Sequence, residues 1–280
     1  YFEEYCTPEK EQKTLFQVEN PPQNLSNSNF IVCWPIEMVY RAENQLLQFA
    51  GFIMPLAYPN SQQLYELCLP NIKQSLQDVL HQKFNRTTKE GMIARFKLCV
   101  NIAIAIHAIH SSKQYVLVDA KPQNISFTPN GQIAVTDVDS IQINDLVGNV
   151  IHHAAVATPE YIPSEGQNGI LLPTTHFIPQ SWDNFAIAVI FYELLMGLHP
   201  YAATFGGAYA NQNTVSEKIQ NGLFVHGNQK KRVSIVPPMH NNYQLLPTTL
   251  QTLFYDAFEN GHNFPDKRPT AEVWGQTLFA

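Results

Sequence analysis

The chain has 280 residues, enough for one large domain or for two lobes with a proper core. With 45% hydrophobic and 14% charged residues, its composition excludes an intrinsically disordered protein. The net charge of −6 excludes the basic footprint of a nucleic-acid-binding chain, so we expect no nucleic-acid partner.

Cysteine use and hydropathy set two further expectations. The four cysteines are scattered and form no C-x-x-C pair, which predicts free thiols in a reducing compartment and therefore a cytoplasmic protein. We expect no membrane span in this chain, because its most apolar stretch, Phe185–Leu198, is shorter than the ~20 residues that a bilayer requires. Because the chain does not begin with Met, we expect it to be part of a longer protein.

The first fifth of the chain is predicted to form one helix and two strands. Thr7 can cap a helix that begins at Pro8 and runs to Val18, since Pro suits the first helical turn. Two apolar runs follow, Phe30–Tyr40 and Leu46–Met54, and a polar turn separates them. This pattern predicts two strands, of which the second ends at Pro55 because proline has no backbone donor.

From about residue 56 the pattern becomes mainly helical. Residues 140–180 are predicted to be mostly coil. Ser181 or Asp183 can cap the most apolar helix, and Gly197 can end it. The predicted helices are Pro70–Gln82, Lys89–Ser111, Asn184–Leu198, Val215–Asn221, Leu250–Asn260 and Thr270–Leu278. A small β-rich part followed by a larger helical part indicates an α+β fold with a site in the cleft between the two.

A β-hairpin is predicted near the middle of the chain, at Ile125–Thr136. Thr128-Pro129-Asn130-Gly131 separates two short apolar runs and supplies the fixed and positive φ angles that a tight turn needs. Asn124 enters the first strand and Asp137 leaves the second, so their side chains lie at the same end of the hairpin. Asp119 and Lys121 lie just upstream.

This set of oxygen-bearing side chains suits Mg²⁺ that carries phosphates, because Mg²⁺ keeps several waters and takes one or two protein ligands. The alternative is a polar hairpin whose Asn and Asp only cap strand ends. The choice between a Mg²⁺ site and a polar hairpin depends on the spacing of further motifs along the chain. These motifs are LVDAKPQN from Leu117, DVD from Asp137, ATPEYIPSE from Ala157, DNFAIAV from Asp183 and DKRPT from Asp266.

Taken in this order, the motifs resemble the catalytic domain of eukaryotic-like protein kinases, in a divergent bacterial-type serine/threonine form that is truncated at its N-terminus. The resemblance extends from Glu9 to Leu278. It implies a two-lobed α+β fold with a partial small β-rich lobe at 1–54, a hinge at 55–57 and a larger mainly helical lobe at 58–280. The larger lobe would hold the catalytic hairpin and the activation segment.

The resemblance also implies a role for each matching residue. Asp119 would be the catalytic base and Lys121 would neutralise the transferred phosphoryl group, while Asn124 and Asp137 would hold Mg²⁺. Met54, Pro55 and Ala57 would bind adenine, and Glu11 would pair with the lysine that binds the phosphates. Thr158 would contact the catalytic base. Glu165, Asp183 and Arg268 would be structural. The implied cofactors are ATP and Mg²⁺, and the implied partner is a protein substrate.

The chain departs from the kinase pattern at several positions. Leu117-Val118 replaces His-Arg before the catalytic Asp, so we expect activity that does not depend on activation-loop phosphorylation. An apolar stack of Leu117 and Val138 with Leu15 is still expected. Asp139 stands where the family has glycine and is a candidate additional metal ligand. A glycine-rich loop and its companion lysine are not found, and Lys10 and Lys13 are poor substitutes because they lie on the predicted helix.

Three functions remain open at this point. The first is an ATP-dependent protein serine/threonine kinase, which the retention of Asp119, Lys121, Asn124 and Asp137 favours. The second is a pseudokinase that acts as a binding module, which the departures favour. The third is a small-molecule kinase on the same scaffold. No zinc site is expected, since His107 and His110 lack a third ligand.

Overall fold

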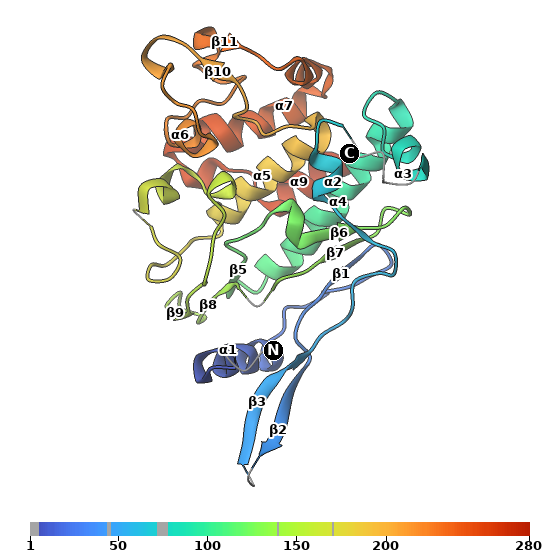
Figure 1. The fold of residues 1–280 in the computed structure, drawn as a ribbon, viewed down its shortest axis with the longest axis vertical. Coiled ribbons are helices and arrows are strands. Elements are labelled where there is room, and N and C mark those ends of the chain that lie inside the picture. Colours follow the sequence, from blue (N-terminus) through green and yellow to red (C-terminus); the bar gives the residue numbers. More distant parts are fainter. Residues whose placement is uncertain (1–5, 44–45, 72–77, 139, 170) are drawn as a thin grey trace.

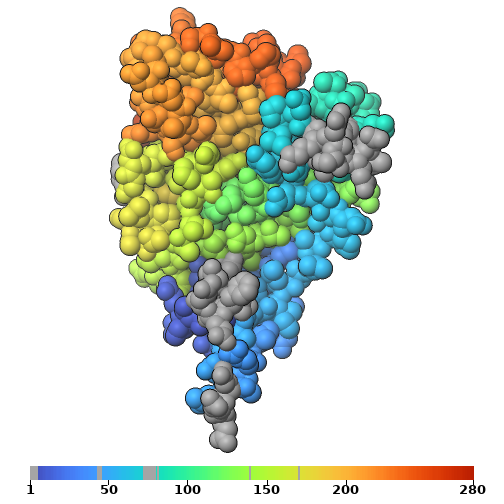
Figure 2. All heavy atoms as spheres, viewed as in Figure 1, coloured from blue at the N-terminus to red at the C-terminus, as the bar shows by residue number. Residues whose placement is uncertain are grey.

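The structure, a computed structural model, describes residues 6–43, 46–71, 78–138, 140–169 and 171–280. It has the predicted α+β fold, in which a small N-terminal part with one helix and a two-stranded sheet adjoins a larger and mainly helical C-terminal part (Figure 1). The molecule tapers from the helical C-terminal part toward the N-terminal part (Figure 2).

Most of the strands lie in the first half of the chain, and the second half is mainly helical. The helices are α1 Pro8–Glu19, α2 Tyr65–Cys68, α3 Asp78–Lys83, α4 Lys89–His110, α5 Ser181–Met196, α6 Val215–Gln220, α7 Thr248–Tyr255, α8 Gly261–Asn263 and α9 Ala271–Phe279. The strands are β1 Phe30–Val32, β2 Glu37–Glu43, β3 Leu46–Ile53, β4 Gln62–Gln63, β5 Tyr115–Val116, β6 Ile125–Phe127, β7 Ile133–Val135, β8 Gln142–Asn144, β9 Val150–His152, β10 Thr204–Phe205 and β11 Val233–Ile235.

Helix α1 begins where the sequence predicts. The Thr7 hydroxyl accepts a hydrogen bond from the backbone N–H of Lys10 at 3.2 Å, and Pro8 occupies the first helical position. The helix ends at Glu19, one residue beyond the prediction. Its buried side chains are Lys13, Thr14 and Gln17, so this face packs against the rest of the molecule.

The predicted strand Phe30–Tyr40 is wrong as a single element. The strand is interrupted between Val32 and Glu37, where Pro35 has no N–H to donate to a neighbouring strand. The first piece, β1, pairs in parallel with β7 of the C-terminal part, and the second piece, β2, forms the hairpin with β3. The N-terminal part is therefore joined to the C-terminal part by a shared sheet, whose strand order is β1-β7-β6-β4.

The hairpin predicted around residue 130 is confirmed. Strands β6 and β7 are antiparallel, with Ile125 opposite Val135 and Phe127 opposite Ile133. Gly131 closes the turn with a φ of +82°, which is the left-handed region that glycine enters at least cost. The segment predicted as coil contains strands β8 and β9, which continue a second sheet from β5.

The core of the C-terminal part surrounds α5, in which 15 of the 16 side chains are buried. The helix begins at Ser181, three residues before the predicted start, and ends at Met196, two residues before the predicted end. Gly197 follows it as the C-cap in a left-handed conformation, which confirms its predicted role in ending the helix. Neither predicted cap is used, because Gln180 stands at the N-cap position and makes no side-chain cap bond there. The prediction of a helix at Pro70–Gln82 is met in part by α3, while its residues 72–77 lie outside the described ranges.

Helix α4 corrects the expectation about membrane spans. It is the one described helix that is long and apolar enough to cross a bilayer by length and composition. Half of its apolar window is buried inside the molecule, where α4 packs against α5, α9 and β7. This burial is what a core helix of a globular domain shows.

Candidate active site

The catalytic loop between β5 and β6 is held in place by Asp183 on α5. The Asp183 carboxylate accepts hydrogen bonds from the backbone N–H groups of Leu117 at 2.7 Å and Val118 at 2.9 Å. His110, the last residue of α4, lies 2.8 Å from the same carboxylate. These contacts fix a strained backbone, because Val118 has a φ of +64°, which β-branched residues rarely adopt. Asp119 follows directly.

Asp119 is 3% exposed and meets two side chains that the sequence analysis named. The Lys121 ammonium donates to Asp119 Oδ2 at 2.5 Å, and the Thr158 hydroxyl donates to Asp119 Oδ1 at 2.6 Å. Lys121 also donates to Thr158 Oγ1 at 2.9 Å. The three groups form a closed set in which an aliphatic hydroxyl lies between a carboxylate and a cation.

Asn124 and Asp137 meet at the open end of the hairpin, as the sequence predicts. The Asn124 amide nitrogen donates to Asp137 Oδ2 at 3.1 Å and to the backbone carbonyl of Asp119 at 3.0 Å. Asp137 has a φ of +58°, so its conformation depends on its surroundings. A small pocket at this place is lined by Asp119, Lys121, Asn124 and Asp137 among others.

The donor set at this end of the hairpin fits Mg²⁺. The Asn124 amide makes both described hydrogen bonds through its nitrogen, which leaves its oxygen for another partner. That oxygen and the Asp137 carboxylate are hard oxygen donors. In the described part of the chain no group of three His, Cys, Asp or Glu side chains could hold a metal ion. A site with two protein ligands is the arrangement that Mg²⁺ with bound phosphates usually takes.

Glu165 and Arg268 form a two-pronged ion pair. Arg268 Nη1 donates to Glu165 Oε1 at 2.6 Å, and Nη2 donates to Oε2 at 2.7 Å. Arg268 is 2% exposed and also donates to the carbonyl of Ser181 at 3.1 Å. The pair therefore ties the end of the activation segment to the start of α5 and to the loop before α9.

Glu11 and Leu15 do not face the catalytic loop. Glu11 is half-buried and bonds the Tyr40 hydroxyl on β2, so that burial and this carboxylate raise the pKa of Tyr40. Leu15 is 38% exposed, whereas Leu117 and Val138 lie in the main core, so the predicted stack with Leu15 is wrong. The helix is turned so that Phe16 packs on this core instead.

The predicted adenine-site residues follow β3. Met54 is 45% exposed, and Pro55 and Ala57 are half-buried. They lie in the connection between β3 and β4. Asp139, the candidate additional metal ligand, lies outside the described residues.

Two residues of α1 that the sequence analysis did not assign to the site contact it. Gln17 donates to the carbonyl of Val138 at 2.7 Å, and Lys13 donates to the carbonyl of His153 at 3.1 Å. They are four apart and so share one face of the helix. The spacing alone could not reveal this face, since α1 also carries Glu9, Glu11 and Leu15 at helical spacings.

A groove of about 480 Å³ lies beside the end of the activation segment. Its lining is mostly apolar and includes Ala157, Pro159, Ile162, Leu171 and Leu172. Tyr161, in the same segment, donates to Glu193 of α5 at 2.8 Å, and burial raises the pKa of Glu193 to about 7. The groove is adjacent to Thr158, which contacts Asp119.

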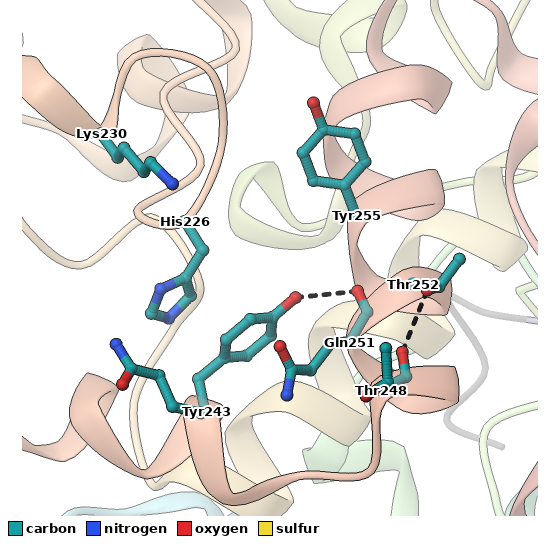
Figure 3. A pocket seen from close by; sticks show the side chains of 8 residues that line it. His226, Lys230, Tyr243, Thr248, Gln251, Thr252 and Tyr255 are labelled. Carbon is teal, nitrogen blue, oxygen red and sulfur yellow. Dashed lines mark hydrogen bonds between the residues drawn. The ribbon is translucent and has the colours of Figure 1, made fainter.

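A second cavity of about 460 Å³ shares no lining residue with the catalytic loop (Figure 3). His226 and Lys230 lie on one side, and Gln251, Thr252 and Tyr255 of α7 lie on the other. The His226 ring stacks on the Tyr243 ring with centroids 3.9 Å apart. The sequence analysis gave no signal for this cavity.

Comparison with known proteins agrees with the geometry. A model of the protein kinase domain matches residues 44–273. The serine/threonine-protein kinase MRCK gamma of Homo sapiens is 35% identical over 111 residues, and MRCK alpha of Homo sapiens is 35% identical over 124 residues. These matches cover 40% and 44% of this chain but only 7% of each relative's length. Because the family model matches most of the chain, and because the motifs meet at one site in the structure, the chain belongs to the protein kinase domain family.

Proposed function

We propose that the chain is the catalytic domain of an ATP- and Mg²⁺-dependent protein serine/threonine kinase. The observation that carries this proposal is the closed set of Asp119, Lys121 and Thr158. The Thr158 hydroxyl shows that an aliphatic hydroxyl fits within hydrogen-bond distance of both the carboxylate and the ammonium group. A substrate serine or threonine presents the same hydroxyl group.

Each residue of the site has a role in this reaction. Asp119 would accept the proton of the attacking hydroxyl, and Lys121 would neutralise negative charge on the transferred phosphoryl group. Asn124 and Asp137 would hold Mg²⁺, which supplies charge stabilisation to the phosphates when it is bound. Asp183 keeps the loop backbone in place. Positioning and electrostatics thus supply the catalysis, without a covalent intermediate.

The groove beside Thr158 favours a protein substrate over a small molecule. Its apolar lining can receive the side chain of an extended segment next to the acceptor hydroxyl. We also propose that 1–54, 55–57 and 58–280 are the small lobe, hinge and large lobe, with adenine at Met54, Pro55 and Ala57. Cys33, Cys68 and Cys99 are free thiols, which supports a location where thiols stay reduced, such as the cytoplasm.

One observation favours a second candidate, a pseudokinase that acts as a binding module. The face of α1 that meets the C-terminal part carries Lys13 and Gln17, whereas Glu11 points to Tyr40. A carboxylate partner for a phosphate-binding lysine is therefore displaced from this face. The retained Asp119, Lys121, Asn124 and Asp137 favour the enzyme.

Phosphate transfer from labelled ATP to a mixed protein substrate tests the proposal, with the full-length protein that contains this chain. We expect Asp119→Asn to lower the rate by roughly 10²- to 10⁴-fold, since it removes the proton acceptor. Asp137→Ala should abolish Mg²⁺-dependent transfer. Asp266→Asn removes an exposed carboxylate elsewhere and is the matched control. Equal transfer by the wild type and the two site variants, or none by the wild type, would reject the catalytic role.

A further inference from the structure

The side chain of Gln17 connects α1 to the segment that bears the proposed Mg²⁺ ligand Asp137. It is fully buried, and its amide nitrogen donates to the carbonyl of Val138 at 2.7 Å. Val138 directly follows Asp137. The Val138 side chain is 1% exposed and packs in the main core, so the core holds its side chain while Gln17 holds its carbonyl.

This contact matters because Asp137 adopts an unfavourable backbone conformation. Its φ of +58° lies in the left-handed region, which is unfavourable for an L-residue. Such a conformation persists only where neighbouring groups fix it. The carbonyl of Asp137 accepts a bond from Ser140 Oγ at 3.3 Å, and the next carbonyl, that of Val138, accepts from Gln17. Together these bonds set the orientation of the two peptide groups that follow the Asp137 side chain.

Gln17 is itself held in place by the C-terminal part and by its own helix. The indole N–H of Trp34 donates to the backbone carbonyl of Gln17 at 3.0 Å, and the Trp34 ring meets Tyr115 edge to face at 4.8 Å. The Tyr115 hydroxyl donates to the carbonyl of Asn20 at 2.6 Å, just beyond the helix. Lys13 anchors the same face one turn earlier, at His153.

We propose that Gln17 is a positioning residue that orients Asp137 for Mg²⁺, so that loss of its hydrogen bond to the Val138 carbonyl lowers the Mg²⁺ affinity of the site. This inference rests on the proposed kinase function, because it assumes that Asp137 binds the metal of a nucleotide complex. Gln17 contacts neither nucleotide nor metal and acts through the Val138 carbonyl.

The test compares Gln17→Met and Gln17→Glu in the full-length protein with Gln12→Met and Gln12→Glu. Gln12 is an exposed glutamine on the same helix, so the control matches the chemistry and the helix. Binding of a fluorescent ATP analogue is measured across a Mg²⁺ series and also without Mg²⁺. Asp137→Ala marks complete loss of the metal ligand. Thermal unfolding of every variant is recorded in parallel.

We expect both Gln17 variants to raise the Mg²⁺ concentration for half-maximal nucleotide binding by roughly fivefold, the factor that loss of one hydrogen bond of about 1 kcal/mol gives. The Met variant removes the donor at similar volume, and the Glu variant places a carboxylate oxygen against the Val138 carbonyl. Binding without Mg²⁺ should stay unchanged per folded molecule, and the Gln12 variants should match the wild type.

Two results would overturn the inference while leaving the proposed function intact. One is a Gln17 variant with the wild-type Mg²⁺ dependence. The other is a loss of binding that is equal with and without Mg²⁺ and that follows the loss of folded protein, since this is the signature of a structural role alone. If the wild type itself shows no Mg²⁺-dependent nucleotide binding, the proposed function fails first.

Discussion

At the scale of single residues, the contacts of Arg268 give it a structural role and not a catalytic one. It is nearly fully buried, while the side chain of its partner Glu165 is 22% exposed. Its guanidinium also lies over the ring of Phe185, with 5.7 Å from Cζ to the ring centroid. Burial of the cation without its partner is costly, because water can no longer solvate the charge. The pair thus holds the activation segment against α5 without touching Asp119.

A double-mutant cycle measures this pair. We expect Glu165→Ala to destabilise the domain by roughly 3 kcal/mol, because it leaves the buried guanidinium with the Ser181 carbonyl and without its carboxylate. Arg268→Ala and the double variant complete the cycle in urea unfolding. A coupling free energy of roughly 2–4 kcal/mol is expected. A coupling below about 0.5 kcal/mol, the range of exposed pairs, would contradict the structural role.

At the scale of elements, two helices each contain a glycine, and the two glycines differ in how closely a neighbouring segment packs against them. Gly91 lies in the first turn of α4, where the Thr88 hydroxyl accepts a bond from its N–H at 3.1 Å. A Cβ on Gly91 would lie 2.0 Å from the backbone carbonyl of Asn85. Gly275 lies within α9, and a Cβ there would meet Ala103 at an ordinary 3.6 Å. One glycine is thus required by packing and the other is not.

This difference predicts opposite effects of the same substitution. Gly275→Ala should stabilise the domain by about 0.5–1 kcal/mol, since alanine favours the helix and restricts the unfolded chain. Gly91→Ala should destabilise it by roughly 2 kcal/mol or more, because backbone must move. Urea unfolding at neutral pH measures both. Equal stability of the two variants would show that the loop before α4 does not press on the helix.

At the scale of the whole molecule, burial of histidines makes stability depend on pH. Burial is the main cause that lowers the pKa of both His199 and His226 to about 4. Burial also lowers the pKa of His152, His240 and His262. In the unfolded chain these groups titrate near 6.5, so the unfolded state binds more protons between pH 6.5 and 4. Folding stability therefore falls as the pH decreases through this window.

Glu193 acts in the opposite direction. Burial raises its pKa to about 7 in the folded state. Its contribution to folding stability is therefore present at low pH and is lost as the pH rises toward 7. Burial raises the pKa of Glu259 as well. The histidine contribution must therefore be isolated by substitution rather than taken from the wild-type curve.

His199→Gln isolates one of the two largest histidine contributions. His199 donates to the carbonyl of Glu160 at 3.0 Å, and Gln can replace this donor. Each pKa unit corresponds to about 1.4 kcal/mol, so we expect the wild type to lose on the order of 2 kcal/mol more than the variant between pH 6.5 and 4.5. His107→Gln, at an exposed position of α4, is the control and should follow the wild-type curve. Parallel curves for wild type and His199→Gln would contradict the prediction.

Local patterns in the sequence determined much of this protein. The Thr7 cap with Pro8 located α1, the apolar spacing located α4, and Gly197 located the C-terminus of α5. The turn at Asn130-Gly131 located the hairpin that brings Asn124 to Asp137. These features depend on residues close together in the chain, whose φ preferences and spacing are visible without the fold. The α+β class followed from them, whereas the resemblance to protein kinases rested on the order of the motifs LVDAKPQN, DVD, ATPEYIPSE, DNFAIAV and DKRPT.

Only the tertiary structure decided the features that join distant segments. The parallel pairing of β1 with β7 connects residues about 100 positions apart, and no local pattern encodes such a pairing. For Asp183 the sequence left two roles open, a helix cap and the contact with the catalytic-loop backbone that the kinase resemblance implies, and the structure shows the bonds to Leu117 and Val118 without the cap. The choice of Gln17 rather than Leu15 as the inner face of α1 depends on how the helix docks, because docking sets which side of a mixed helix is buried.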